Sequence, residues 1–296
     1  MKNLIKKPIV FIGTGRNGST IISEFFFKHK DLAFPSNYSK KFYEYPKLNI
    51  IRNIFENKLW LIRGKKKQLN KISSFNPLFF RPAEAYPMWK YLSGNEVDFK
   101  NDFLLDTKAS AAKIKFIRNY FTKMVKYQNK LRLAFKLTGP SRIKYILSIF
   151  PDAEFVVVRR NPIHTISSFL KVSYWNERKK KIHWDGIYSN DEINFINESP
   201  DLIGTTFQIK KILSTTNKEL QKYKAKYIEI NFEDFIDSPL DEIKILLKFC
   251  NLNADPQLEK YILNTKVYNR NKSEAEYFSN EDLNQIKYIL SDDFKI

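Results

Sequence analysis

The segment over residues 8–29 constrains the fold more than any other part of this chain, because a buried strand, a glycine-rich turn and an amphipathic helix follow one another directly. The apolar run over 9–12 is typical of a parallel strand that is covered on both faces. The apolar residues after the turn recur at helical spacing, at Ile21, Ile22, Phe25 and Phe26. The segment therefore predicts an α/β protein.

The turn, GTGRNGST over residues 13–20, has the composition of a phosphate-binding loop. Gly13, Gly15 and Gly18 permit positive φ angles and a close approach of the backbone, so that N–H groups and the helix N-terminus converge on an anion. The loop differs from the nucleoside triphosphate signature GxxxxGK[ST], because Ser19 stands where that signature has lysine.

The cation of this loop is Arg16, whose planar guanidinium can bind a terminal anionic group through two hydrogen bonds. Such a loop suits a phosphorylated donor and is poorly suited to magnesium–ATP chemistry. The residues expected to hold the donor are Gly15, Arg16, Asn17, Gly18, Ser19 and Thr20.

The rest of the chain alternates between strand and helix patterns, which predicts a mainly parallel central sheet with helices on both sides. Strands are expected over 32–34, 131–137, 154–158 and 227–230, and helices over 108–130, 141–150, 163–171, 202–223, 239–250 and 256–263. Ser141 and Asn161 are the expected N-caps of two of these helices. We expect one domain over 1–296, with a three-layer fold of the P-loop type.

Residues 39–94 do not fit this alternation, because they are rich in aromatic residues and contain four prolines. Long connections of this kind often carry binding function. We therefore expect an insertion or lid over the acceptor site.

A second group of polar residues lies at the ends of predicted strands. Lys136 ends one strand, Arg160 follows another, and Ser168 lies in the next helix. In open parallel sheets, ligands bind outside the carboxyl ends of the strands, where the loop over 13–20 also lies. Arg159 stands where a P-loop nucleotidase would need a magnesium-binding aspartate, which disfavours a kinase-like enzyme.

These motifs together resemble the sulfotransferases that use 3′-phosphoadenosine 5′-phosphosulfate. The loop is similar to their 5′-phosphosulfate loop, and FKLTGPSRIKYILSIFPDAEFVVVRRNPIHTISSFL over 135–170 is similar to their second signature. The resemblance implies that Arg160 and Ser168 hold the 3′-phosphate and that Lys136 lies near the transferring sulfuryl group. It extends over 8–29 and 131–250, including YIEINFEDFIDSP over 227–239.

The sequence departs from this family at the general base that sulfuryl transfer needs. Thr138 stands where cytosolic members have a histidine, and Asn37 stands where another branch has a glutamate. Glu44 is the expected base, with Asp106 and His29 as remoter alternatives.

The resemblance implies transfer of a sulfuryl group to a hydroxyl or amine of a carbohydrate, lipid or small alcohol, with no metal. An ATP- or GTP-dependent P-loop transferase and an inactive nucleotide-binding module remain alternatives. The formal charge of +19 attracts anions and is compatible with contact at a membrane surface, but no readout motif indicates nucleic-acid binding. No run approaches the roughly 20 apolar residues of a membrane span, and the first strand begins too early for a signal peptide, so we expect a cytoplasmic protein.

Overall fold

The computed structural model describes residues 5–55, 79–95, 97–176, 181–294 and 296. At its centre lies a sheet of five strands in the order β2-β3-β1-β4-β5, in which every pair of neighbours is parallel. The strands are β1 (Ile9–Gly13), β2 (Leu32–Ala33), β3 (Arg132–Thr138), β4 (Glu154–Arg159) and β5 (Lys226–Asn231). The predicted α/β class and the five predicted strands are confirmed, with shifts of at most one residue at each end.

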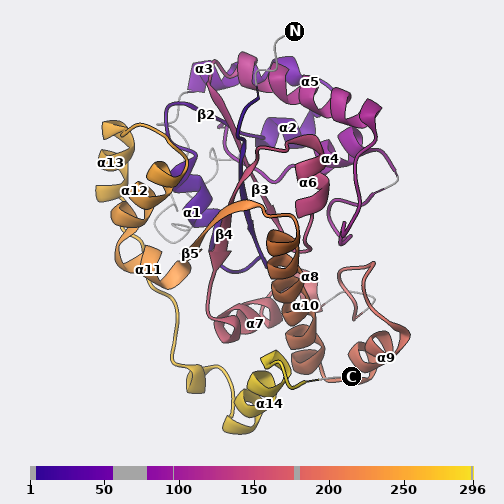
Figure 1. Cartoon of the computed structure of the whole chain (residues 1–296). Coiled ribbons are helices and arrows are strands. Elements are labelled where there is room, and N and C mark those ends of the chain that lie inside the picture. The colour runs from indigo at the N-terminus through magenta and orange to yellow at the C-terminus, as the bar shows by residue number, and fades with distance from the viewer. Residues whose placement is uncertain (1–4, 56–78, 96, 177–180, 295) are drawn as a thin grey trace.

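Helices cover both faces of the sheet, as Figure 1 shows. The alternating side chains of β4 demonstrate this, because Phe155 and Val157 pack into one hydrophobic core while Val156 and Val158 pack into another. The first core includes side chains of α4 (Tyr86–Ser93), α5 (Ala111–Tyr127) and α6 (Ile143–Ile149). The second includes side chains of α1 (Ser19–Phe26), α11 (Phe232–Asp237), α12 (Pro239–Phe249) and α13 (Pro256–Leu263). The chain is thus the expected three-layer protein.

A third hydrophobic cluster lies beyond the carboxyl ends of the strands, at the bottom of Figure 1. It is built from α7 (Pro162–Leu170), α8 (Ser173–Asn176), α10 (Asp201–Lys222) and α14 (Asn280–Leu290). A smaller cluster joins α9 (Asn190–Glu198) to α10 through Ile196 and Phe207. In the part of the chain that the structure describes, no helix combines the length and the apolar character that crossing a bilayer requires.

The helix starts show where local sequence signals succeed and fail. Asn161 caps α7 as predicted, because its side chain accepts a hydrogen bond from the N–H of Ile163 at 2.8 Å. The prediction for Ser141 is wrong: its hydroxyl donates instead to Glu219 at 2.6 Å. The same Glu219 oxygen accepts the N–H of Ile143 at 3.2 Å, so a buried carboxylate of α10 caps α6.

The described part of residues 39–94 is more regular than its composition suggests. It contains most of α2 (Asn37–Lys41), then η1 (Pro46–Ile50), α3 (Ile51–Phe55) and α4, while 56–78 lie outside the described residues. Trp89 of α4 is fully buried and stacks on Phe99 with ring centroids 4.7 Å apart. Because α4 packs into the first hydrophobic core, it is part of the folded body of the protein. The predicted lid could therefore include only the segments next to α4.

Candidate active site

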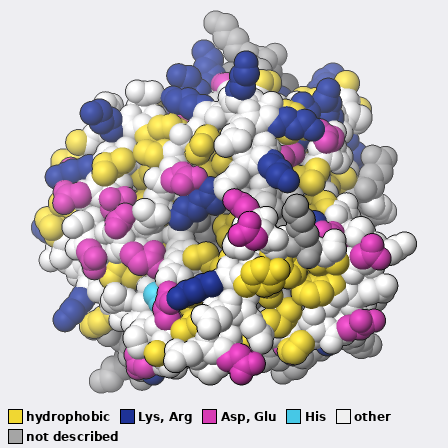
Figure 2. Space-filling view, turned by 60° about the horizontal axis from the view of Figure 1, so that its bottom comes forward, with side chains coloured by type: hydrophobic (Ala, Val, Ile, Leu, Met, Phe, Trp, Pro, Cys, Tyr) yellow, Lys and Arg dark blue, Asp and Glu magenta, His cyan; other side chains and the backbone are white. Residues whose placement is uncertain are grey.

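Two neighbouring cavities open at the carboxyl ends of the strands. The larger has a volume of about 710 Å³ and the smaller about 520 Å³. They share five lining residues: Thr20, Glu84, Tyr86, Lys100 and Lys136. Figure 2 looks onto this face and shows basic and acidic side chains close together near its middle. The two cavities therefore meet at a junction of oppositely charged groups.

The glycine-rich loop after β1 is held tightly against the sheet. The buried side chain of Asn17 donates to the carbonyl of Val158 in β4 at 2.7 Å. Gly18 has a φ of +83°, and a Cβ at this position would lie 2.0 Å from the ring of Phe232. Only glycine fits there, which explains the loop's spacing. Four predicted donor-binding residues line the smaller cavity: Gly15, Arg16, Ser19 and Thr20.

The structure brings Arg16, Arg160 and Ser168 together from three segments of the chain. Arg16 Nε donates to Ser168 Oγ at 3.1 Å, and Arg160 Nη1 donates to the carbonyl of Arg16 at 2.7 Å. Arg160 Nη2 donates to Asn271 at 2.5 Å, whereas Arg160 Nε is buried and has no hydrogen-bond partner among the residues that the structure describes. Burial lowers the pKa of Arg160, although Glu233 nearby opposes the shift. A desolvated guanidinium with an unused N–H fits an anionic ligand.

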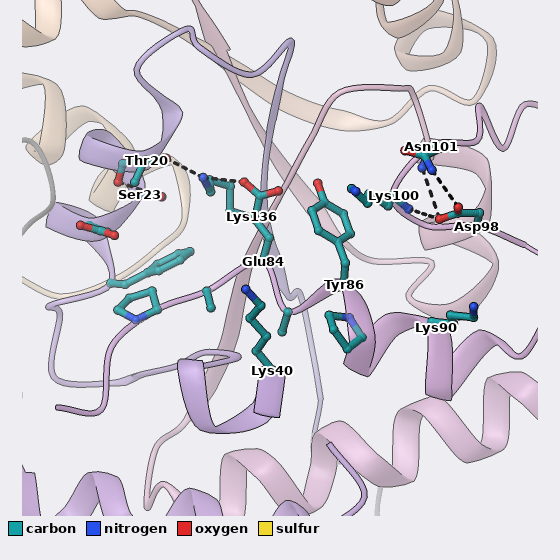
Figure 3. Close-up of a pocket in the computed structure, with 16 residues that line it drawn as sticks. Thr20, Ser23, Lys40, Glu84, Tyr86, Lys90, Asp98, Lys100, Asn101 and Lys136 are labelled. Carbon is teal, nitrogen blue, oxygen red and sulfur yellow. Dashed lines mark hydrogen bonds and ion pairs between the residues drawn. The ribbon is translucent and has the colours of Figure 1, made fainter. Parts of the chain in front are cut away.

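Lys136 lies at the junction of the two cavities (Figure 3). Its ammonium group donates to the hydroxyl of Thr20 at 2.7 Å and pairs with Glu84 Oε1 at the same distance. β3 places the residue there, because Lys136 is paired with Phe11 beside the start of the loop. The predicted lysine thus lies between the loop helix and a carboxylate.

That carboxylate, Glu84, is a candidate site residue that the sequence analysis did not identify. Its two oxygens lie 3.1 and 3.2 Å from Thr138 Oγ1, which donates to them. Burial acts to raise the pKa of Glu84, but the charge of Lys136 and hydrogen bonds from Lys136, Tyr86 and Thr138 outweigh it and lower the pKa. Glu84 is therefore ionised at neutral pH.

Hydrogen bonds from the Asn37 side chain and from the backbone beside it carry Glu84 to this place. Asn37 accepts the N–H of Arg81 at 3.1 Å and donates to the carbonyl of Phe79 at 3.0 Å. The N–H of Ala83 donates to the carbonyl of Pro35 at 2.9 Å. Asn37, which stands where one branch of the resembled family has a glutamate, thus anchors the segment that supplies one. No local sequence pattern identifies the segment around Glu84 as part of the site. The absence of an acid at position 37 indicates only that the base must come from elsewhere.

The base candidates from sequence lie elsewhere. Glu44 is exposed and lines neither cavity. Asp106 is exposed and pairs with Lys222 at 2.6 Å, and His29 Nε2 lies 2.9 Å from the carbonyl of Asn253. Arg159 is paired with Glu229 at 2.5 Å. Among the described residues, no group of His, Cys, Asp or Glu side chains is arranged to hold a metal ion.

Comparison with known proteins shows the fold and the family of the chain. No curated protein sequence matched the chain. The structure is similar to sulfotransferase STF9 from Mycobacterium avium, with a TM-score of 0.55 and 13% identity over 99% of this chain and 78% of that one. It is also similar to sulfotransferase STF1 from Mycobacterium tuberculosis H37Rv, with a TM-score of 0.49 and 14% identity over 97% and 77%. The model of the Sulfotransferase family matches residues 8–256, and the chain therefore belongs to the sulfotransferase family.

Proposed function

We propose that this enzyme transfers a sulfuryl group from 3′-phosphoadenosine 5′-phosphosulfate to a hydroxyl or amine of an acceptor. The observation that carries the proposal is the junction of the two cavities, where Lys136, Thr20 and Glu84 meet. A donor in the smaller cavity and an acceptor in the larger would bring their reacting atoms together there.

The smaller cavity and its surroundings supply groups for both ends of the donor. Loop N–H groups, the start of α1 and Lys136 would bind the phosphosulfate end. Arg160 and Ser168 would bind the 3′-phosphate, with the unused Nε of Arg160 as a donor. The side chain of Arg16 donates to Ser168, and the carbonyl of Arg16 accepts from Arg160. Arg16 would therefore lie between the 5′ and 3′ ends of the donor rather than at the 5′ end alone.

Glu84 would act as the general base in place of Glu44. The acceptor hydroxyl gives its proton to the Glu84 carboxylate as its oxygen attacks sulfur. The new S–O bond forms while the bond from sulfur to the 5′-phosphate oxygen breaks, and the bisphosphate leaves with the bonding electron pair. Lys136 neutralises the charge that grows on this phosphate, and Thr138 orients the carboxylate.

The alternatives explain the site less well. An ATP- or GTP-dependent transferase would need the loop lysine that Ser19 replaces and the aspartate that Arg159 replaces. An inactive binding module would have no use for an ionised carboxylate beside Lys136. Four points remain predictions: the acceptor is a carbohydrate, a lipid or a small alcohol; the reaction needs no metal; the protein is cytoplasmic; and it does not bind nucleic acid.

Two measurements test the proposal. Calorimetry should show that 3′-phosphoadenosine 5′-phosphate binds equally well with magnesium and with a chelator, and far more tightly than ATP. Radiolabelled donor should then pass its sulfuryl group to alcohols in an acceptor screen. Magnesium-dependent ATP binding without a response to the bisphosphate would contradict the proposal. Tight bisphosphate binding without turnover of any acceptor would favour the inactive module.

A further inference from the structure

We propose that the acceptor carries an anionic group, a phosphate or a carboxylate, which Lys40, Lys90 and Lys100 bind at the larger cavity. This inference rests on the proposed function and narrows the class of acceptor. The three lysines come from α2, from α4 and from the connection between α4 and α5, yet all three line the same cavity.

The lysines lie on two sides of the space that an acceptor would occupy. Figure 3 shows the amino group of Lys40 pointing into the cavity on the side of Glu84, while Lys90 and Lys100 lie on the side of Asp98 and Asn101. An acceptor whose hydroxyl lies beside Glu84 would therefore present its remaining groups to ammonium groups.

The acidic residues of the cavity are engaged elsewhere. Glu84 pairs with Lys136, and Asp98 accepts the N–H of Lys100 at 2.8 Å and the side-chain amide of Asn101 at 3.0 Å. Glu24 interacts electrostatically with Lys28. Within 5–55, 79–95, 97–176 and 181–294, Lys40, Lys90 and Lys100 form no ion pair. The three ammonium groups are thus without an ion-pair partner among the described residues, and the lining of the cavity holds four lysines against three carboxylates.

The backbone that carries these lysines is fixed. The buried guanidinium of Arg142 donates to the carbonyl of Lys100 at 3.1 Å and to that of Pro140 at 2.9 Å. Ser36 caps α2 by accepting two N–H groups, both at 3.2 Å, and the buried Trp89 anchors α4 beside Lys90. The side chains of the three lysines are exposed, whereas the backbone that carries them is held by these contacts.

This arrangement discriminates by charge rather than by shape. Lysine binds phosphate and carboxylate as a point charge, and exposed ammonium groups contribute modestly and less at high salt. The removal of one such charge should weaken an anionic ligand by about 3- to 5-fold at low ionic strength. Neutral alcohols of the same shape should be unaffected.

The test uses the whole protein saturated with 3′-phosphoadenosine 5′-phosphate, so that the donor site is closed to the probes. Calorimetry compares glucose 6-phosphate and glucuronate with glucose, and glycerol 3-phosphate with glycerol. The variant Lys40→Gln/Lys90→Gln is compared with Lys41→Gln, since Lys41 is exposed on the same helix and lines neither cavity. Lys100 is left unchanged because it also lines the smaller cavity.

We expect each anionic probe to bind at least about 10-fold more tightly than its neutral partner, and this preference to fall about 10-fold in the double variant but not in Lys41→Gln. Vesicles of phosphatidylglycerol in phosphatidylcholine, sedimented with the protein, distinguish a lipid headgroup from a free phosphate ester. Equal binding of anionic and neutral probes, or equal loss in Lys41→Gln, would overturn the inference. Failure of the bisphosphate itself to bind would instead refute the proposed function.

Discussion

Replacing Glu84 with glutamine would remove the carboxylate from the junction of the cavities while keeping the size of the side chain and an oxygen for the Thr138 hydroxyl. A positioned base contributes about 100- to 10,000-fold to the rate, or about 3–5 kcal/mol of the barrier. We expect kcat of Glu84→Gln to fall by that factor in a radiolabelled transfer assay. KM for the donor should change little, because Glu84 acts on the acceptor proton.

The ion pair with Lys136 adds a second signature to the same variant. The side chains of Lys136 and Glu84 are 12% and 18% exposed, so their loss of pairing costs about 1–3 kcal/mol of folding free energy, between the values for surface and buried pairs. The melting temperature should therefore fall by a few degrees without loss of the fold. The bisphosphate should bind Glu84→Gln as tightly as the wild type or more tightly, since Lys136 no longer has a carboxylate competing for it.

The pH dependence follows from the lowered pKa of Glu84. A carboxylate whose pKa is lower in the folded state stabilises the protein above its unfolded pKa of about 4.3, and this stabilisation disappears as the pH falls through the folded pKa. The kcat/KM of the wild type, which reports the ionisation of the free enzyme, should accordingly stay level through neutral pH and decline only in acid below the usual glutamate range. Glu84→Gln should lack that acidic decline.

Glu44→Gln is the matched control, because Glu44 is an exposed glutamate that lines neither cavity. It should keep wild-type kcat, donor affinity and melting temperature. The reasoning would be refuted if Glu84→Gln kept full turnover, or if Glu44→Gln lost as much.

Three further perturbations test the site and the core. Arg160→Ala should weaken 3′-phosphoadenosine 5′-phosphate by about 10- to 150-fold in calorimetry but leave adenosine 5′-phosphosulfate within about twofold; Ser168→Ala should show the same selectivity more mildly, and equal weakening of both ligands would contradict the assignment. Gly18→Ala should lower donor affinity at least about 10-fold and lower the melting temperature, because its Cβ would lie 2.0 Å from a phenylalanine ring at a φ of +83°, whereas Gly186→Ala at +101° meets its nearest atom only at 3.7 Å and should affect the fold through backbone strain alone. Trp89→Ala should destabilise the fold by about 3–5 kcal/mol in urea unfolding, since the indole is fully buried; a loss below about 1 kcal/mol would contradict its place in the main core.

The sequence predicted what depends on neighbouring residues. The loop over 13–20 and the strand that ends near Lys136 carry their signals within a few residues, so periodicity and glycine spacing place them at one edge of a parallel sheet. That Arg16, Arg160 and Ser168 lie at this shared edge followed from the sequence, whereas the direct contacts of Arg16 with Ser168 and Arg160 did not.

What the sequence could not provide depends on contacts between distant segments. Glu84 reaches the junction because Phe79 and Arg81 form hydrogen bonds with Asn37. These residues are too far apart along the chain for a local sequence pattern to reveal the contact. Ser141 failed as a cap for a similar reason, because the buried carboxylate of Glu219 comes from a helix far along the chain. Tertiary partners of this kind override local preference and leave no periodic trace.

The sharing of the Lys136 ammonium between Thr20 and Glu84 has a consequence for the moment at which the base becomes able to act. In the empty enzyme the carboxylate is neutralised by lysine and is a poor acceptor for a hydroxyl proton. A donor that draws Lys136 toward its phosphosulfate would release Glu84, whose burial would then raise its proton affinity. An alcohol that arrived before the donor would meet a base not yet able to act, so the site would become competent for proton transfer only once the donor is bound.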